Sequence, residues 1–240
     1  VKRIIQQGKS KSIFKDSEIG LANWKKHMIS FALGERLDID FPSVKSGNIP
    51  SVGYYNKIYG EGRWAYSTIY SISIGQGEVQ VVPIQMANLA AIIANRGYYL
   101  MPHFVKSVNS GDTIPEKYRQ KYYTTVDQKY FEVVANAMQQ VVEADHGTAR
   151  KARIEGIEVC GKTGTAENPH GEDHSVFMAF APKNNPEIAI VVYVENAGFG
   201  GTWAAPIASL VMEKYLTGNI ADIEKEKRIL DANFLALENK

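Results

Sequence analysis

A lysine, a hydroxyl and two glycines follow one another in the run Gly161–Ala166, directly after the apolar, strand-like segment Ile157–Cys160. The ammonium of Lys162 offers a fixed cation for a carboxylate, and the hydroxyl of Thr163 offers a hydrogen-bond donor beside it. Glycine has no side chain, so a flat ligand could lie directly against the backbone there. This run therefore predicts a site for an anionic ligand on a strand.

The elements that must position this run predict an α+β domain. Apolar residues recur at helical spacing from Leu21 to a stop at Gly34, and residues 39–66 are rich in Gly, Pro, Ser and Tyr, as an irregular connector would be. Further helices are predicted at 83–97, 127–147 and 206–216, a short strand or two within 98–108, and strands at 157–161, 175–181 and 188–194. Helices followed by adjacent strands and a helix favour an antiparallel sheet flanked by helices.

Composition excludes several functional classes. The 240 residues carry 27 Lys and Arg against 26 Asp and Glu, so a stripe for binding nucleic acid is not expected. The single cysteine, Cys160, excludes an internal disulfide and a cysteine-rich metal site. The sequence has no apolar run of roughly 20 residues and no signal peptide, and it starts at Val1 rather than Met. We expect a piece of a longer protein, with one domain at 1–218 and a charged helix or tail at 219–240.

Several other blocks occur in a fixed order around the lysine run. They are Phe31–Pro42, Gly47–Pro50, Ser73–Gly77, Val82–Ala87, His146–Ala149 and Ala204–Ala208. Together with Lys162-Thr163-Gly164, which is typical of penicillin-binding proteins and class A β-lactamases, they resemble the transpeptidase domain of class B penicillin-binding proteins, most closely the elongation type. The resemblance implies a penicillin-binding/β-lactamase-like transpeptidase fold, with a five-stranded antiparallel sheet between helices and an all-helical region beside it.

The resemblance also implies an activity and roles for individual residues. It implies a peptidoglycan D,D-transpeptidase, which transfers an acyl group from a D-Ala-D-Ala stem peptide to a serine. Lys162 and Thr163 would hold the terminal carboxylate of that peptide, or of a β-lactam, on the strand that includes Gly164. The backbone N–H of Thr165 would be one oxyanion donor, and its hydroxyl would also reach the carboxylate. No cofactor is implied.

By the same resemblance, the parent protein would be anchored by an N-terminal helix at the periplasmic face of the bacterial inner membrane. It would act there with a polymerase of the cell-wall elongation machinery. No nucleic acid is expected as a partner.

The sequence contains no convincing match for the acylating serine. Ser12–Lys15 is the one formal Ser-x-x-Lys match, and its polar surroundings could not bury a neutral lysine. Ser46–Asn48 and Ser107–Asn109 match Ser-x-Asn in letters, but serine and asparagine are common in turns for backbone reasons. We therefore expect both motifs to precede Val1, so that this chain alone is inactive.

Three residues are candidates for the rim of the cleft: Gln76, Glu167 and Trp203. Gln76 lies between two glycines that predict a tight turn, and Trp203 could equally serve packing. Glu167 stands where the family has glutamine or serine, and its carboxylate could repel an anionic ligand.

Other groups have simpler explanations. Residues 168–174 hold two histidines and two acidic residues, but they predict a solvated hairpin tip rather than a metal site. Cys160 is expected to be a buried small residue. The tyrosines at 54, 55, 59, 66 and 70 could form a platform for a glycan or partner, although packing within the connector is the default.

Alternatives remain within and outside the enzyme class. A septal transpeptidase would share these blocks, and a β-lactam sensor domain is a further alternative, whereas the long Tyr-rich connector disfavours a class D β-lactamase. A non-catalytic binding module of the same fold would keep the lysine strand and lack the serine. Acylation of the full-length parent by a penicillin separates an enzyme from such a module.

Overall fold

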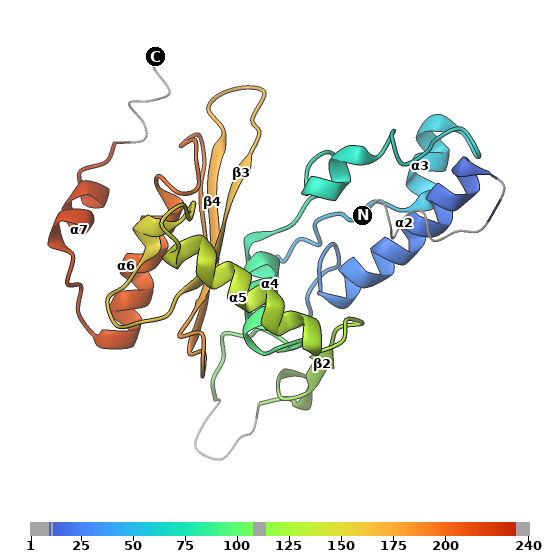
Figure 1. The fold of residues 1–240 in the computed structure, drawn as a ribbon. Coiled ribbons are helices and arrows are strands. Elements are labelled where there is room, and N and C mark those ends of the chain that lie inside the picture. The colour runs from blue at the N-terminus through green and yellow to red at the C-terminus, as the bar shows by residue number, and fades with distance from the viewer. Residues whose placement is uncertain (1–9, 11, 108–113, 234–240) are drawn as a thin grey trace. The chain divides into compact units, whose positions relative to one another are not determined.

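The computed structural model describes residues 10, 12–107 and 114–233 (Figure 1). These residues fall into two compact units. The first unit comprises segments of Val1–Gln85 and Leu100–Val126, and the second comprises segments of Met86–Tyr99 and Asp127–Lys240. The boundary runs through the first turn of α4 (Pro83–Ala94) and through the short strand β1 (Tyr98–Leu100), which pairs with β2 (Lys121–Tyr123).

The second unit is built on an antiparallel sheet of three strands in the order β3-β4-β5. The strands are β3 (Cys160–Ala166), β4 (His174–Ala181) and β5 (Ile188–Val194). The register places Lys162 opposite Met178 and Thr165 opposite Ser175. Because β3 pairs only with β4 among the described residues, the backbone groups of its other edge have no strand partner there.

Small side chains let a helix pack closely on this sheet. In α6 (Ala204–Thr217), Ala204, Ala205, Ala208 and Met212 are fully buried, and they share one core cluster with Phe177 and the alanines at 179 and 181 of β4. Val142, near the end of α5 (Lys129–Glu143), belongs to the same cluster. Figure 1 shows α6 alongside the strands. Residues of α5 and α6 therefore pack against the sheet that carries the lysine run.

The first unit is mainly helical. It contains α2 (Ile13–Ser30), α3 (Val52–Tyr59) and two 3-10 turns at Tyr70–Ile74 and Glu116–Tyr118. Its core joins Leu21 and Trp24 of α2 to Tyr55, Trp64 and Ile72. The second unit also has a 3-10 turn at Arg150–Ala152 and a last helix, α7 (Ile223–Leu230). No helix in the described part of the chain is both long and apolar enough to span a membrane.

The α+β architecture with an antiparallel sheet flanked by helices is confirmed, and several details differ from the sequence prediction. The first helix begins at Ile13 rather than Leu21, because the Ser12 side chain caps it. The predicted connector at 39–66 contains α3, which Ser51 caps in the same way. The strand predicted at 157–161 starts at Cys160 and continues to Ala166, since pairing with β4 extends that far. Within the described residues this sheet has three strands, not five.

Candidate functional site

The side chains of β3 divide between its two sides. Successive residues of a strand point in opposite directions, so Thr163 and Thr165 share one side while Lys162 and Gly164 share the other. Both threonines are half-buried, whereas Lys162 is exposed. The strand therefore presents two hydroxyls on one side and an ammonium on the other.

The two threonines line a pocket of about 510 Å³. Its other walls are the turn before β3, with Thr148, and the loop Phe199–Thr202 before α6. The hydroxyls of Thr148 and Thr163 are 2.9 Å apart and share a hydrogen bond. A pocket of this size that carries several hydroxyls can hold a small polar ligand.

The wall formed by the loop before α6 depends on glycines. A Cβ atom on Gly200 would lie 2.1 Å from the carbonyl oxygen of Val176 and 2.5 Å from that of Gly164. A Cβ atom on Gly201 would lie 2.4 Å from the carbonyl oxygen of Thr148. Only glycine permits the loop to lie this close to the strands and to the turn.

A buried serine fixes both ends of this loop. Ser175 of β4 is fully buried, and its hydroxyl donates to the carbonyl of Phe199 at 3.0 Å and accepts from the N–H of Ala204 at 3.1 Å. Sequence analysis did not single out Ser175. Its one visible signal was a polar residue at the start of an otherwise apolar strand.

Two cations in the pocket were also missed. Arg150 and Lys151 line it together with the threonines. Both are exposed, and within the described residues neither side chain forms an ion pair. They directly follow the block His146–Ala149, so their position in the sequence was a usable signal.

Lys162 takes a different position from the one its predicted role suggests. Its ammonium donates a hydrogen bond of 2.7 Å to the carbonyl of Thr163, and Lys162 is not among the residues that line the pocket. The lysine therefore lies at the edge of β3, next to the hydroxyl-lined pocket rather than inside it.

The three candidate rim residues lie in different places. Thr202, the neighbour of Trp203, lines the pocket, while the Trp203 ring is covered by the guanidinium of Arg228, 4.6 Å from its centroid. Glu167 follows β3 directly and is exposed. Gln76 belongs to the first unit, where its N–H donates to the carbonyl of Ser71 in a tight turn.

Cys160 and the hairpin tip 168–174 have structural roles. Burial raises the pKa of the Cys160 thiol to about 11, which makes it a poor nucleophile at neutral pH. At the tip between β3 and β4, the Asn168 amide donates to the Asn196 side chain, and the Asp173 carboxylate accepts from the Asn168 N–H. These bonds hold the hairpin tip together.

Ser12 and Lys15 do not form a nucleophile–base pair. The Ser12 hydroxyl accepts from the Lys15 N–H at 3.4 Å as the cap of α2. The Lys15 ammonium forms an ion pair of 3.1 Å with Glu18, and 62% of the Lys15 side chain is exposed. A lysine becomes a base when it is desolvated, which is the opposite of this environment.

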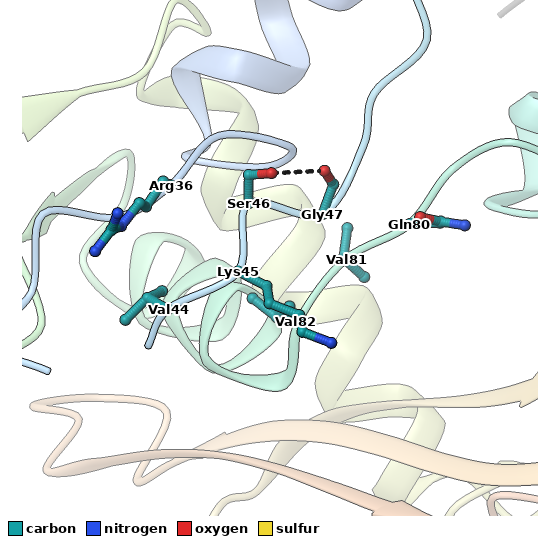
Figure 2. A pocket seen from close by; sticks show the side chains of 8 residues that line it. All are labelled: Arg36, Val44, Lys45, Ser46, Gly47, Gln80, Val81 and Val82. Atoms are coloured by element: carbon teal, nitrogen blue, oxygen red, sulfur yellow. Dashed lines mark hydrogen bonds between the residues drawn. The ribbon is translucent and has the colours of Figure 1, made fainter. Parts of the chain in front are cut away.

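The letter match Ser46–Asn48 lies in an irregular segment that ends in an isolated β-bridge between Asn48 and Gln80, not in the surface turn that the sequence predicted, and its role is structural. The Asn48 side chain donates to the carbonyl of Glu78 at 2.8 Å, and the Asn48 and Gln80 backbones exchange two hydrogen bonds. Figure 2 shows the Ser46 hydroxyl bonded to the Gly47 carbonyl at the wall of a second pocket, of about 640 Å³. The match Ser107–Asn109 falls partly on residues 108 and 109, which lie outside the described residues.

One buried side chain holds the walls of this second pocket in place. Gln85 is fully buried, and its amide group donates to the carbonyls of Glu35 and Ser46 at 2.7 and 2.9 Å. Its carbonyl oxygen accepts from the N–H of Val82 at 3.2 Å. The first unit therefore uses the Ser46–Asn48 segment for packing.

Comparison with known protein families decides the classification. Residues 8–213 match the model of the penicillin-binding protein transpeptidase domain. The chain belongs to this family. The family predicted from the blocks around Lys162 is confirmed.

Several relatives are similar over most of the chain. The peptidoglycan D,D-transpeptidase MrdA of Haemophilus influenzae is 32% identical over 223 residues, which are 85% of this chain and 34% of the relative. The crystal structure of Pseudomonas aeruginosa PBP2 in complex with WCK 5153 is 31% identical, with a TM-score of 0.73, over 85% of this chain and 44% of the other. A ceftriaxone acyl-enzyme complex of penicillin-binding protein A from M. tuberculosis is 26% identical, with a TM-score of 0.64, over 85% and 46% of the two chains.

The penicillin-binding protein transpeptidase domain thus spans about a third of the length of the curated relatives that it matches. The match over residues 8–213 includes β3, which therefore belongs to the family fold.

Proposed function

We propose that this chain is the carboxylate-binding part of a peptidoglycan D,D-transpeptidase of the elongation type, which crosslinks stem peptides by acyl transfer from D-Ala-D-Ala to a serine. One observation carries the proposal. The edge strand β3 presents the Thr163 and Thr165 hydroxyls to a pocket of about 510 Å³ in a domain of the transpeptidase family. The relatives named as D,D-transpeptidases support the reaction class.

In this proposal the residues of β3 share the work of binding. The Thr163 and Thr165 hydroxyls donate to the terminal carboxylate of the peptide or of a β-lactam, and the Lys162 ammonium adds charge at the edge of the strand. Gly164 lets the ligand approach the backbone, and the Thr165 N–H serves as one oxyanion donor. Hydrogen bonds to a charged carboxylate are about twice as strong as neutral ones, so this end of the ligand anchors it.

An NMR titration of the 15N-labelled chain with N-butyryl-D-Ala-D-Ala tests the proposal. We expect saturable shifts at the amides of Thr148, Thr163 and Thr165, and binding roughly tenfold weaker for the C-terminal carboxamide, which cannot accept charged hydrogen bonds. The variants Thr163→Val and Thr165→Val keep the side-chain shape and should each weaken binding about tenfold. Their unperturbed spectra elsewhere would report a retained fold.

Binding of the carboxamide as tight as that of the acid would contradict the proposal, because the carboxylate would then play no part. Equal binding of N-butyryl-L-Ala-L-Ala would contradict the assignment to D-Ala-D-Ala.

The proposal extends to the parent protein. There, the acylating serine would come from outside the described residues, since Ser12 caps α2 and Lys15 is exposed. The parent would act at the periplasmic face of the inner membrane with an elongation polymerase. A structure titled for a peptidoglycan synthase complex, 27% identical with a TM-score of 0.72, supports such a partner.

A further inference from the structure

The pocket beside β3 contains two positively charged residues to which the proposed carboxylate site gives no role. Arg150 and Lys151 line the same pocket as Thr163 and Thr165. Among the described residues, no acidic side chain forms an ion pair with either of them. The Arg150 and Lys151 cations are thus available to a ligand.

The charge balance of the site favours a ligand with more than one anionic group. In the proposed function, the two threonine hydroxyls of β3 bind a single terminal carboxylate in the pocket, and the Lys162 ammonium lies at the edge of the strand beside it. Arg150 and Lys151 bring two further positive charges, and a guanidinium can bind a carboxylate through two parallel hydrogen bonds. The pocket, at about 510 Å³, also has room for several residues of a peptide rather than for one carboxylate.

The walls of the pocket keep these charges near β3. Ala149, next to Arg150, is fully buried, and its N–H donates to the carbonyl of Val141 at 3.0 Å. Ala152, next to Lys151, is also fully buried and donates to the carbonyl of Ala149 at 2.8 Å. The backbone that carries both cations is therefore fixed on either side, so a ligand does not have to order this segment of the main chain.

We propose that Arg150 and Lys151 form a second anion-binding subsite. The site would then prefer a D-Ala-D-Ala peptide that carries an additional carboxylate on the N-terminal side of its last two residues. This inference rests on the proposed function, because it takes the terminal carboxylate to lie at Thr163 and Thr165. Arg150 and Lys151 act as specificity-determining residues in this role.

A matched pair of ligands isolates the second carboxylate. N-succinyl-D-Ala-D-Ala and N-butyryl-D-Ala-D-Ala have acyl groups of similar length, and only the succinyl group carries a carboxylate. In NMR titrations of the 15N-labelled chain at low salt, we expect the succinyl peptide to bind roughly three- to tenfold more tightly. The preference should be lost in the double variant Arg150→Gln/Lys151→Gln, and it should weaken as salt is added.

The control variant is Lys57→Gln, which removes one exposed positive charge from α3 in the first unit. It should keep the full preference, since a general electrostatic attraction would be reduced by either change. The butyryl peptide should still shift the amides of Thr163 and Thr165 in the double variant, with a smaller loss of affinity than the succinyl peptide, which would show that the pocket remains folded.

The outcomes separate this inference from the proposed function. Equal affinity of the wild type for both peptides, or a preference that survives in the double variant, would overturn the second subsite alone. No binding of either peptide at β3 would overturn the proposed function together with the subsite that rests on it.

Discussion

At the scale of single residues, the two glycines of the lysine run have different reasons to be glycine. A Cβ atom on Gly161 would lie 2.2 Å from a ring carbon of Phe177, which is fully buried. A Cβ atom on Gly164 would lie 3.4 Å from Val176, an ordinary contact, and Gly164 has no positive φ. Packing therefore requires the first glycine, whereas only a ligand that approaches the backbone would require the second.

This difference predicts that alanine at Gly161 affects stability, whereas alanine at Gly164 affects ligand binding. Gly161→Ala should lower the free energy of unfolding by about 1–3 kcal/mol, because the core around Phe177 would be overpacked. Gly164→Ala should change it by no more than about 0.5 kcal/mol. Because the added Cβ would lie on the Lys162 side of the strand, it should weaken the binding of N-butyryl-D-Ala-D-Ala by crowding a ligand that reaches the Lys162 ammonium. Urea denaturation and the NMR titration measure the two quantities. Unchanged affinity in Gly164→Ala would remove the ligand from this part of the strand.

The chemistry of β3 could be predicted from the sequence, and its surroundings only in part. A lysine next to a threonine and a glycine indicates anion binding wherever it occurs on a strand. Arg150 lines the pocket, and its place directly after the block His146–Ala149 was a usable signal. Ser175 acts on the pocket by fixing the loop before α6, a contact between segments distant in sequence that no local pattern reveals.

At the scale of elements, boundaries were harder to predict than element types. The helix predicted at 206–216 and the strand at 188–194 agree closely with α6 and β5, because strongly apolar residues and a terminal Gly218 mark them. The short helix α3 was missed because eight residues with one buried side chain give a weak periodic pattern. The sequence left the segment after 218 open between a helix and a tail, and α7 lies within it.

The helix α7 is held by specific contacts, and these give a prediction. The Arg228 guanidinium lies over the Trp203 ring, and it also donates to the carbonyl of Thr202 at 2.8 Å. Arg228→Ala should lower the free energy of unfolding by about 0.5–1 kcal/mol, as expected for a partly exposed cation–π contact. It should also change the tryptophan fluorescence of the native protein.

Lys227→Ala, one residue earlier on an exposed position of α7, is the matched control and should leave both quantities unchanged. If Arg228→Ala behaved like this control, the contact with Trp203 would contribute nothing to the position of α7.

At the scale of the whole molecule, the family follows from the order of short blocks along the chain. The match over residues 8–213 agrees with that order. The division into two compact units was not predicted, because the second unit takes up a segment around α4 that is distant in sequence from its remaining residues. Composition and periodicity describe segments, whereas this division depends on which segments meet in the fold.

The whole chain also gives a chemical prediction, because it carries the proposed carboxylate site and a single Ser-x-x-Lys match. Ser12 is used as a helix cap, and the exposed Lys15 ammonium is paired with Glu18. A serine without a neighbouring base attacks an acyl group slowly. The isolated chain, incubated with a fluorescent penicillin, should therefore show no stoichiometric adduct by gel fluorescence or intact mass, while a known penicillin-binding enzyme in the same assay is labelled. Stoichiometric labelling that disappears in Ser12→Ala would assign the nucleophile to Ser12, and the helix cap would have to open during the reaction.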